Sequence, residues 1–333
     1  MKKWLKWVIV VLILGLIVWL LKDINFYEVY LLLKYANPLW IGLAVLSTFL
    51  SFIVWGIRWK FIFKKDFWFL LNVLFAGAFF NTVTPGAGVG GEPFKAHFLT
   101  KRYNQPRTKM LGYVLGDKFT QIGILVILGV FSVLFVLFYV KISLTLKLIL
   151  VLALIIIVAL FFFVSYSLLK KLHFNFGAIL KKFHFLKIIK KDFKTPEHFE
   201  AYINKKVKSF LKIFNKFVRS RNNMIVGFFL STVYWTLNFL TPYFLFLAFG
   251  FEIDFLSVVI VTTLGFIIGA LSILPGGVVI TELTMTLLFS AMGIFPPLAL
   301  LVVLLTRLIY YFFSLVVGGL SLLYIRKITN GEK

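Results

Sequence analysis

The chain has 333 residues, of which 61% are hydrophobic and 19% aromatic, whereas only 14% are charged. These proportions exclude an ordinary soluble domain and predict an integral membrane protein. Lys and Arg number 36 against 12 Asp and Glu, a net charge of +24, and they cluster between apolar runs, which indicates cytoplasmic loops rather than a nucleic-acid surface. Cysteine is absent and histidine occurs four times, so we expect no disulfide, no metal site and no cofactor.

The N-terminal residues predict one span followed by an interfacial stretch. Lysines precede the apolar run 8–21, which fits either a signal peptide or a first span. Because no small-residue cleavage site follows, we favour a retained span with the N-terminus in the cytoplasm. Residues 23–38 mix polar and aromatic side chains, which is typical of an interfacial helix. A second span is predicted over about 39–63, and it ends at the basic pair Lys64 and Lys65.

The next segment is an apolar run that is interrupted at membrane depth. Residues 67–80 are apolar, the run breaks before Pro85-Gly86, and a second basic cluster begins near Lys101. If both basic clusters are cytoplasmic, the segment is a hairpin that enters and leaves by the same face, either re-entrant or with two tight arms. Irregular backbone at this depth must be covered by protein or line a water-filled cavity. A carboxylate at the same depth, Glu92, is therefore a candidate functional residue.

Two more spans are predicted over about 111–140 and 144–169, and the first of them contains Asp117 and Lys118. Residues 170–222 then hold 15 Lys and Arg against three acids, the strongest cytoplasmic signal in the chain. A helix that starts near Pro196 would place its phenylalanines opposite its lysines, as in a basic amphipathic helix on the inner leaflet. Nucleic-acid binding is the alternative for this charge run, and we reject it in a membrane context.

These boundaries give three parts: an N-terminal membrane half (1–169), a basic cytoplasmic linker (170–222) and a C-terminal membrane half (223–333). In the last part, a span reaches the outside near Gly250. The run 256–274 breaks at a second Pro-Gly step and returns through residue 292. A final span over about 297–325 ends at basic residues, which places the C-terminus in the cytoplasm.

The two Pro-Gly stretches share the pattern P-G-x-x-V-x-x-E, which ends at Glu92 in the first and Glu282 in the second. The first hairpin starts and ends inside, and the second starts and ends outside. The sequence therefore predicts an all-α polytopic membrane protein with about six full spans and two Pro-Gly-broken hairpins in inverted-topology repeats. Secondary transporters with such repeats bind their substrates near the midplane. A hairpin corner that binds nothing is the structural alternative.

The span after each hairpin carries a cation, Lys118 in the first half and Arg307 in the second. A charge within a span needs a partner, so we predict that Glu92 pairs with Lys118 and Glu282 with Arg307. Two alternatives remain: a purely structural salt bridge, and cations that snorkel to an interface. We include Asp117, next to Lys118, in the predicted substrate site.

Two stretches resemble the lysylphosphatidylglycerol synthetase transmembrane-region family, which includes flippase-like and UPF0104 membrane proteins. They are Phe80 to Gly86 with Gly90 to Lys95, and Leu274 to Gly277 with Glu282. The resemblance covers about residues 1–326 and implies a polytopic lipid flippase-like module. It places the following residues near the lipid path: Asn81, Pro85, Gly86, Gly91, Glu92, Lys95, Pro275, Gly276, Gly277 and Glu282. The family's full-length synthetases carry a soluble catalytic domain, and none is expected after Ile325, so lysyl transfer is not expected.

The leading functional hypothesis is translocation of an anionic lipid, or of a lipid-linked precursor, between the leaflets of the cell membrane. Lys118 and Arg307 would neutralise its phosphate, and the two glutamates would hold these cations when the site is empty. One alternative is an intramembrane lipid-modifying enzyme with Glu92 as general base. The other is a scaffold that anchors a cytoplasmic partner through residues 170–222.

Overall fold

The computed structural model describes residues 34–84, 90–169, 196–272 and 274–330, and within these ranges all regular structure is helical. Five helical segments there are long and apolar enough to cross a membrane. They are α3 (Pro38–Phe63), α6 (Arg107–Tyr139), α7 (Leu144–Leu169), α11 (Arg221–Ala248) and the run of α14 (Pro296–Tyr311), η3 (Phe312–Val317) and α15 (Gly318–Asn330). They correspond to five of the six predicted spans. The sixth, over 8–21, lies outside the described residues.

The two predicted hairpins are pairs of shorter helices. The first consists of α4 (Phe67–Val83) and α5 (Glu92–Tyr103). The second consists of α12 (Phe255–Leu271) and α13 (Ile280–Ala291), joined through the single turn η2 (Pro275–Gly277). At about 1.5 Å per residue, the longest arms extend roughly 25 Å, which is less than the roughly 30 Å of a hydrocarbon core. These lengths favour arms that end inside the membrane.

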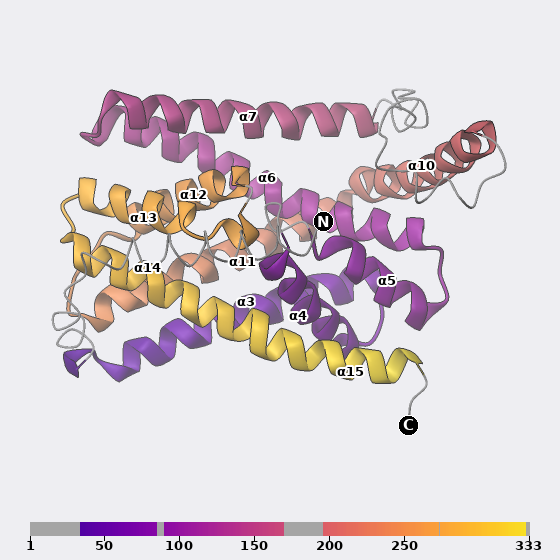
Figure 1. Cartoon of the computed structure of the whole chain (residues 1–333), viewed down its shortest axis with the longest axis horizontal. Coiled ribbons are helices and arrows are strands. Elements are labelled where there is room, and N and C mark those ends of the chain that lie inside the picture. The colour runs from indigo at the N-terminus through magenta and orange to yellow at the C-terminus, as the bar shows by residue number, and fades with distance from the viewer. Residues whose placement is uncertain (1–33, 85–89, 170–195, 273, 331–333) are drawn as a thin grey trace, which may run out of the picture.

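The hairpins approach each other from opposite ends of the molecule. Figure 1 shows α12 and α13 towards one end of the long axis, and α4 and α5 towards the other. The end of α4 meets η2 in the middle: a Cβ atom added to Gly276 in η2 would lie 3.6 Å from the carbonyl oxygen of Thr82 in α4. This arrangement is the one expected of oppositely oriented hairpins. The evolutionary relation between them as inverted repeats stays a prediction.

Local sequence signals set the helix ends that position these tips. The side chain of Asp66 caps α4 by accepting a 2.6 Å hydrogen bond from the Phe69 amide, and Asp254 caps α12 by accepting a 3.0 Å bond from Ser257. Lys64 ends α3 in a left-handed conformation, with φ at 50°. Each hairpin therefore begins at a capped turn directly after a long helix.

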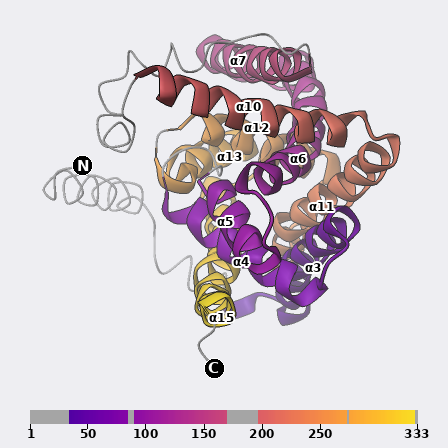
Figure 2. The ribbon, with the colours of Figure 1, turned by 90° about the vertical axis from the view of Figure 1, so that its right-hand side faces the viewer.

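The basic helix α10 (Pro196–Arg219) begins at the proline that the sequence indicated. Figure 2 shows α10 lying across α6. The contact uses glycines on α6: Phe217 covers Gly116, and Ile213 covers Gly112. Phe217 is fully buried by this packing. Part of the apolar face that we expected on the inner leaflet thus packs against the helix that carries Lys118. The linker residues 170–195 lie outside the described residues.

Candidate functional site

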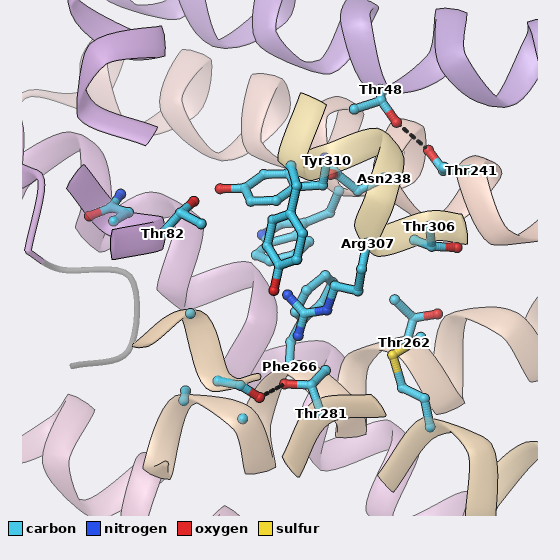
Figure 3. Close-up of a pocket in the computed structure, with 18 of the residues that line it drawn as sticks. Thr48, Thr82, Asn238, Thr241, Thr262, Phe266, Thr281, Thr306, Arg307 and Tyr310 are labelled. Atoms are coloured by element: carbon cyan, nitrogen blue, oxygen red, sulfur yellow. Dashed lines mark hydrogen bonds between the residues drawn. The ribbon is translucent and has the colours of Figure 1, made fainter. Parts of the chain in front are cut away.

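A cavity of about 190 Å³ lies where the two hairpin tips meet. Asn81 and Thr82 from the end of α4 line it on one side, and Gly276 and Gly277 of η2 line it on the other. Figure 3 shows the labelled threonines around it and the ring of Tyr310 directed towards Thr82. Its wall is rich in hydroxyl and amide groups, contributed by Thr48, Asn81, Thr82, Gln121, Asn238, Thr241, Thr262, Thr281 and Thr306. Aromatic rings complete it, including Trp55, Tyr234, Trp235, Phe266, Tyr310 and Tyr311.

Both predicted ion pairs form beside this cavity. Lys118 Nζ lies 3.8 Å from Glu92 Oε1, and Arg307 Nε lies 2.9 Å from Glu282 Oε1. The two cations line the cavity, whereas both glutamates are buried behind them, with 1% of Glu92 and 4% of Glu282 exposed. The pairing prediction is therefore confirmed. The arrangement presents positive charge to the cavity and keeps the carboxylates behind it.

The glutamates occupy equivalent positions in their hairpins. Glu92 lies in the first turn of α5, and Glu282 lies in the first turn of α13. The partial positive charge of a helix N-terminus favours a carboxylate there. The shared P-G-x-x-V-x-x-E pattern thus places each carboxylate just after the hairpin tip, at the start of the returning arm.

Lys95 is a second cation on Glu92. Its Nζ donates hydrogen bonds of 3.0 and 3.1 Å to the two carboxylate oxygens, and it lies 4.3 Å from the centre of the Trp55 ring. Lys95 is fully buried and does not line the cavity. Its alkyl chain fills the space above Gly77, where a side chain would collide with it. The structure therefore places this predicted site residue behind the cavity wall, as a partner of Glu92.

Asp117 is also behind the wall, in a network that the sequence reasoning missed. It forms a salt bridge with Arg58 and accepts hydrogen bonds from the indole nitrogens of Trp55, at 3.0 Å, and Trp59, at 2.9 Å. Arg58 also donates a 2.6 Å bond to the hydroxyl of Ser231. This network joins α3, α6 and α11. Arg58 lies in the second predicted span, two residues before Lys60, and a charge within a span is the signal for a buried partner.

The glycines of the tips are explained by backbone geometry. The Gly91 amide donates a 2.6 Å hydrogen bond to the side-chain oxygen of Asn81, and a Cβ atom there would collide with the Gly77 carbonyl. Gly276 and Gly277 have φ of 62° and 68°, a region that side chains disfavour. Pro275 begins η2. Pro85 and Gly86, the corresponding residues of the first tip, lie outside the described residues.

The charges around the cavity do not balance. Among the described residues at or directly behind its wall there are four cations, Arg58, Lys95, Lys118 and Arg307, and three carboxylates, Glu92, Asp117 and Glu282. With these groups ionised, the site carries one net positive charge. In the described part of the chain, no three His, Asp or Glu side chains gather closely enough to hold a metal ion. The site is thus suited chemically to one bound anion.

Known proteins match this chain over most of its length. The sequence model described as the lysylphosphatidylglycerol synthase TM region matches residues 5–318. A UPF0104 membrane protein of Pyrococcus horikoshii is 28% identical over 310 residues, which are 89% of this chain and 90% of the relative. A UPF0104 membrane protein of Methanocaldococcus jannaschii is 25% identical over 303 residues, 89% of this chain and 88% of the relative. The chain therefore belongs to the family of the lysylphosphatidylglycerol synthase transmembrane region.

Proposed function

We propose that this protein moves an anionic lipid, or a lipid-linked precursor, between the leaflets of the cell membrane. The observation that carries the proposal is the cavity between the hairpin tips, where Lys118 and Arg307 face inwards and their carboxylate partners stand behind them. Membrane-embedded charge is costly and is retained where it serves a pathway. Secondary transporters likewise bind their substrates between two oppositely oriented repeats, near the midplane of the membrane.

In this mechanism the lipid head group enters the cavity while the acyl chains remain among the surrounding helices. The phosphate accepts charge-assisted hydrogen bonds from Lys118 and Arg307, and Lys118 gives up its contact with Glu92 in exchange. The single net positive charge of the empty site complements the single negative charge of a phosphodiester. Binding therefore neutralises the site, which reduces the electrostatic cost of crossing the apolar core.

The distribution of basic residues supports an orientation with both termini in the cytoplasm. Lys64 and Lys65 after α3, Arg107 at the start of α6, and Arg326 near the end of α15 belong to the end of the long axis where α5 and α10 lie. The α11–α12 connection at the other end carries Glu252 and Asp254 instead. An excess of Lys and Arg is characteristic of cytoplasmic loops.

The burial of Glu92 argues against the enzyme alternative. A general base must reach the proton that it removes. Glu92 is 1% exposed, is bonded through both oxygens to Lys95 and does not line the cavity. The scaffold alternative depends on residues 170–222, and its test is replacement of that linker by a neutral one.

The experiment is leaflet exchange of fluorescent phosphatidylglycerol in vesicles that contain the purified protein. We expect rapid exchange by the parent, and a loss of at least about tenfold in the Glu92→Gln/Glu282→Gln double variant, because four cations would then face one carboxylate and a single phosphate would no longer neutralise the site. Glu252→Gln, in the exposed α11–α12 connection, is the matched control and should exchange lipid normally. Normal exchange by a folded double variant would refute the proposal.

A further inference from the structure

A second cavity, of about 230 Å³, lies between the α3–α4 turn, the α5–α6 turn and the start of α6. These turns belong to the end of the molecule where α5 and α10 lie (Figure 1). The rings of Phe63 on α3 and Tyr113 on α6 meet in its wall, with their centroids 5.7 Å apart. One water needs only roughly 10–15 Å³ of such space, so a larger polyatomic group fits. The cavity shares no lining residue with the one between the hairpin tips.

The charged groups of this wall are two lysines, Lys65 from the α3–α4 turn and Lys109 from the first turn of α6. Lys109 Nζ donates a 2.8 Å hydrogen bond to Gln105 Oε1, and Lys65 Nζ lies 5.1 Å from the centre of the Tyr103 ring. Gln105 and Tyr103 also line the cavity. Both ammonium groups are therefore held at the wall by neighbours that carry no charge.

Neither lysine forms an ion pair with a carboxylate of the described residues. The nearest acid in the chain, Asp66, accepts a 2.6 Å hydrogen bond from the Phe69 amide and does not line the cavity. An ammonium group has three N–H donors, and the bond to Gln105 uses one of those of Lys109. The cations of the other cavity, by contrast, are each paired with a glutamate. This second cavity thus offers two cations whose counter-charge is not supplied by the described residues.

The remainder of the wall is largely apolar and includes Ile62, Phe63 and Met110. A small inorganic ion gains nothing from such a surface, whereas the organic part of a larger anion is stabilised by it. Lysine is a common ligand of phosphate, to which it donates charge-assisted hydrogen bonds. The two halves of the wall therefore match the two parts of a phosphate ester.

We propose that this cavity binds a phosphate ester, with the phosphate on Lys65 and Lys109 and the organic substituent against the apolar wall. The site goes beyond the proposed transport and does not require it. A lipid head group of the adjoining leaflet and a soluble phosphate ester offer the same chemistry, and the experiment separates these two sources.

The test measures how fast individual lysines of the full chain are acetylated in neutral detergent, with and without dihexanoyl phosphatidylglycerol. Acetylation requires the uncharged amine, and a bound phosphate keeps an ammonium group protonated, so Lys65 and Lys109 should react at least about tenfold more slowly with the probe. Lys64 is the matched control, because it is exposed beside Lys65 and does not line the cavity. Its rate should change by less than about twofold, since salt screens exposed charges.

Glycerophosphoglycerol, which is the same head group without acyl chains, identifies the source of the phosphate. Protection of Lys65 and Lys109 at a lower concentration of the lipid probe assigns the site to a lipid head group. Equal protection by both probes assigns it to a soluble phosphate ester. Unchanged acetylation of both lysines with either probe would overturn the site.

Lys109→Met provides a second measurement, because it removes one of the two cations. About tenfold more probe should then be needed to protect Lys65. Lys60→Met changes an exposed lysine of α3 outside the cavity and should leave that concentration unchanged. If Lys109→Met behaved like Lys60→Met, the phosphate would not lie between the two lysines, and the proposed site would be wrong.

The same experiment separates this site from the transport proposal, because Lys118 in the other cavity is read in parallel. Protection of Lys118 without protection of Lys65 and Lys109 would overturn the second site and leave transport standing. Protection of Lys65 and Lys109 by a protein that exchanges no lipid in vesicles would refute transport and leave the second site standing.

Discussion

The two hairpins place their glutamates alike but surround them with different numbers of cations. Glu92 contacts Lys95 at 3.0 Å and Lys118 at 3.8 Å, whereas Glu282 pairs with Arg307 at 2.9 Å. In the second hairpin Met285 stands where Lys95 stands in the first. Each of these side chains packs over a helix glycine, Gly77 under Lys95 and Gly265 under Met285. The same backbone arrangement therefore supports two different electrostatic environments.

This difference predicts which cation can move. If Lys118 turned towards a bound phosphate, Glu92 would keep its two hydrogen bonds from Lys95. If Arg307 moved away, Glu282 would remain as a buried carboxylate, and its Oε2 already has no hydrogen-bond partner among the described residues. An uncompensated buried charge is strongly destabilising. We therefore expect Arg307 to stay fixed and Lys118 to follow the ligand.

The largest effect is expected from Arg307→Met. It leaves Glu282 buried without its cation, which should cost about 3–5 kcal/mol of stability. The measurement is the midpoint of thermal unfolding in detergent. The double variant Arg307→Met/Glu282→Met removes both charges and should recover most of the loss. If the double variant were as unstable as the single one, lost packing rather than a stranded charge would explain the effect.

Lys95→Met should have an intermediate effect, and it makes the first hairpin resemble the second. Glu92 would lose two charge-assisted hydrogen bonds but keep Lys118, so we expect a loss of about 2 kcal/mol in thermal unfolding. Exchange of phosphatidylglycerol should also slow. Among the described cations only Lys118 would still contact Glu92, and this contact would hold it away from the phosphate. Adding Glu92→Gln to Lys95→Met should restore part of the exchange. No recovery would show that Lys95 acts through packing alone.

Lys118→Met should separate stability from transport. Its contact with Glu92 is long, and its side chain is 19% exposed, so the variant should lose less than about 1 kcal/mol. Exchange of phosphatidylglycerol should nevertheless fall by about tenfold, because the phosphate loses a charged donor. A variant with normal exchange would remove Lys118 from the proposed path. A variant that unfolds would contradict the assignment of Lys95 as the main partner of Glu92.

The sequence was enough to predict those residues of the site that are charged and lie within apolar runs. Glu92, Lys118, Glu282 and Arg307 stood out because each charge in a span needs a partner, and position along the chain suggested the pairs. Sequence reasoning missed that Lys95 and Arg58 are buried, because a basic residue a few positions before a basic cluster looks like part of a loop or of the membrane interface. The threonines and aromatic residues of the cavity give no signal in one sequence, since each is also ordinary packing material. Their convergence depends on how the helices pack.

Two glycine variants test the backbone of the tips themselves. Gly276→Ala should destabilise the protein by about 1 kcal/mol, because φ at 62° is unfavourable for a residue with a side chain, although the added Cβ atom would make only ordinary contacts, the nearest at 3.6 Å from the Thr82 carbonyl oxygen. Gly91→Ala should cost more, because its Cβ atom would collide with the backbone carbonyl of Gly77. Thermal unfolding of the two variants side by side measures this difference. Equal losses would show that the first tip adjusts its backbone as easily as the second, and that the close approach of α4 and α5 does not fix Glu92.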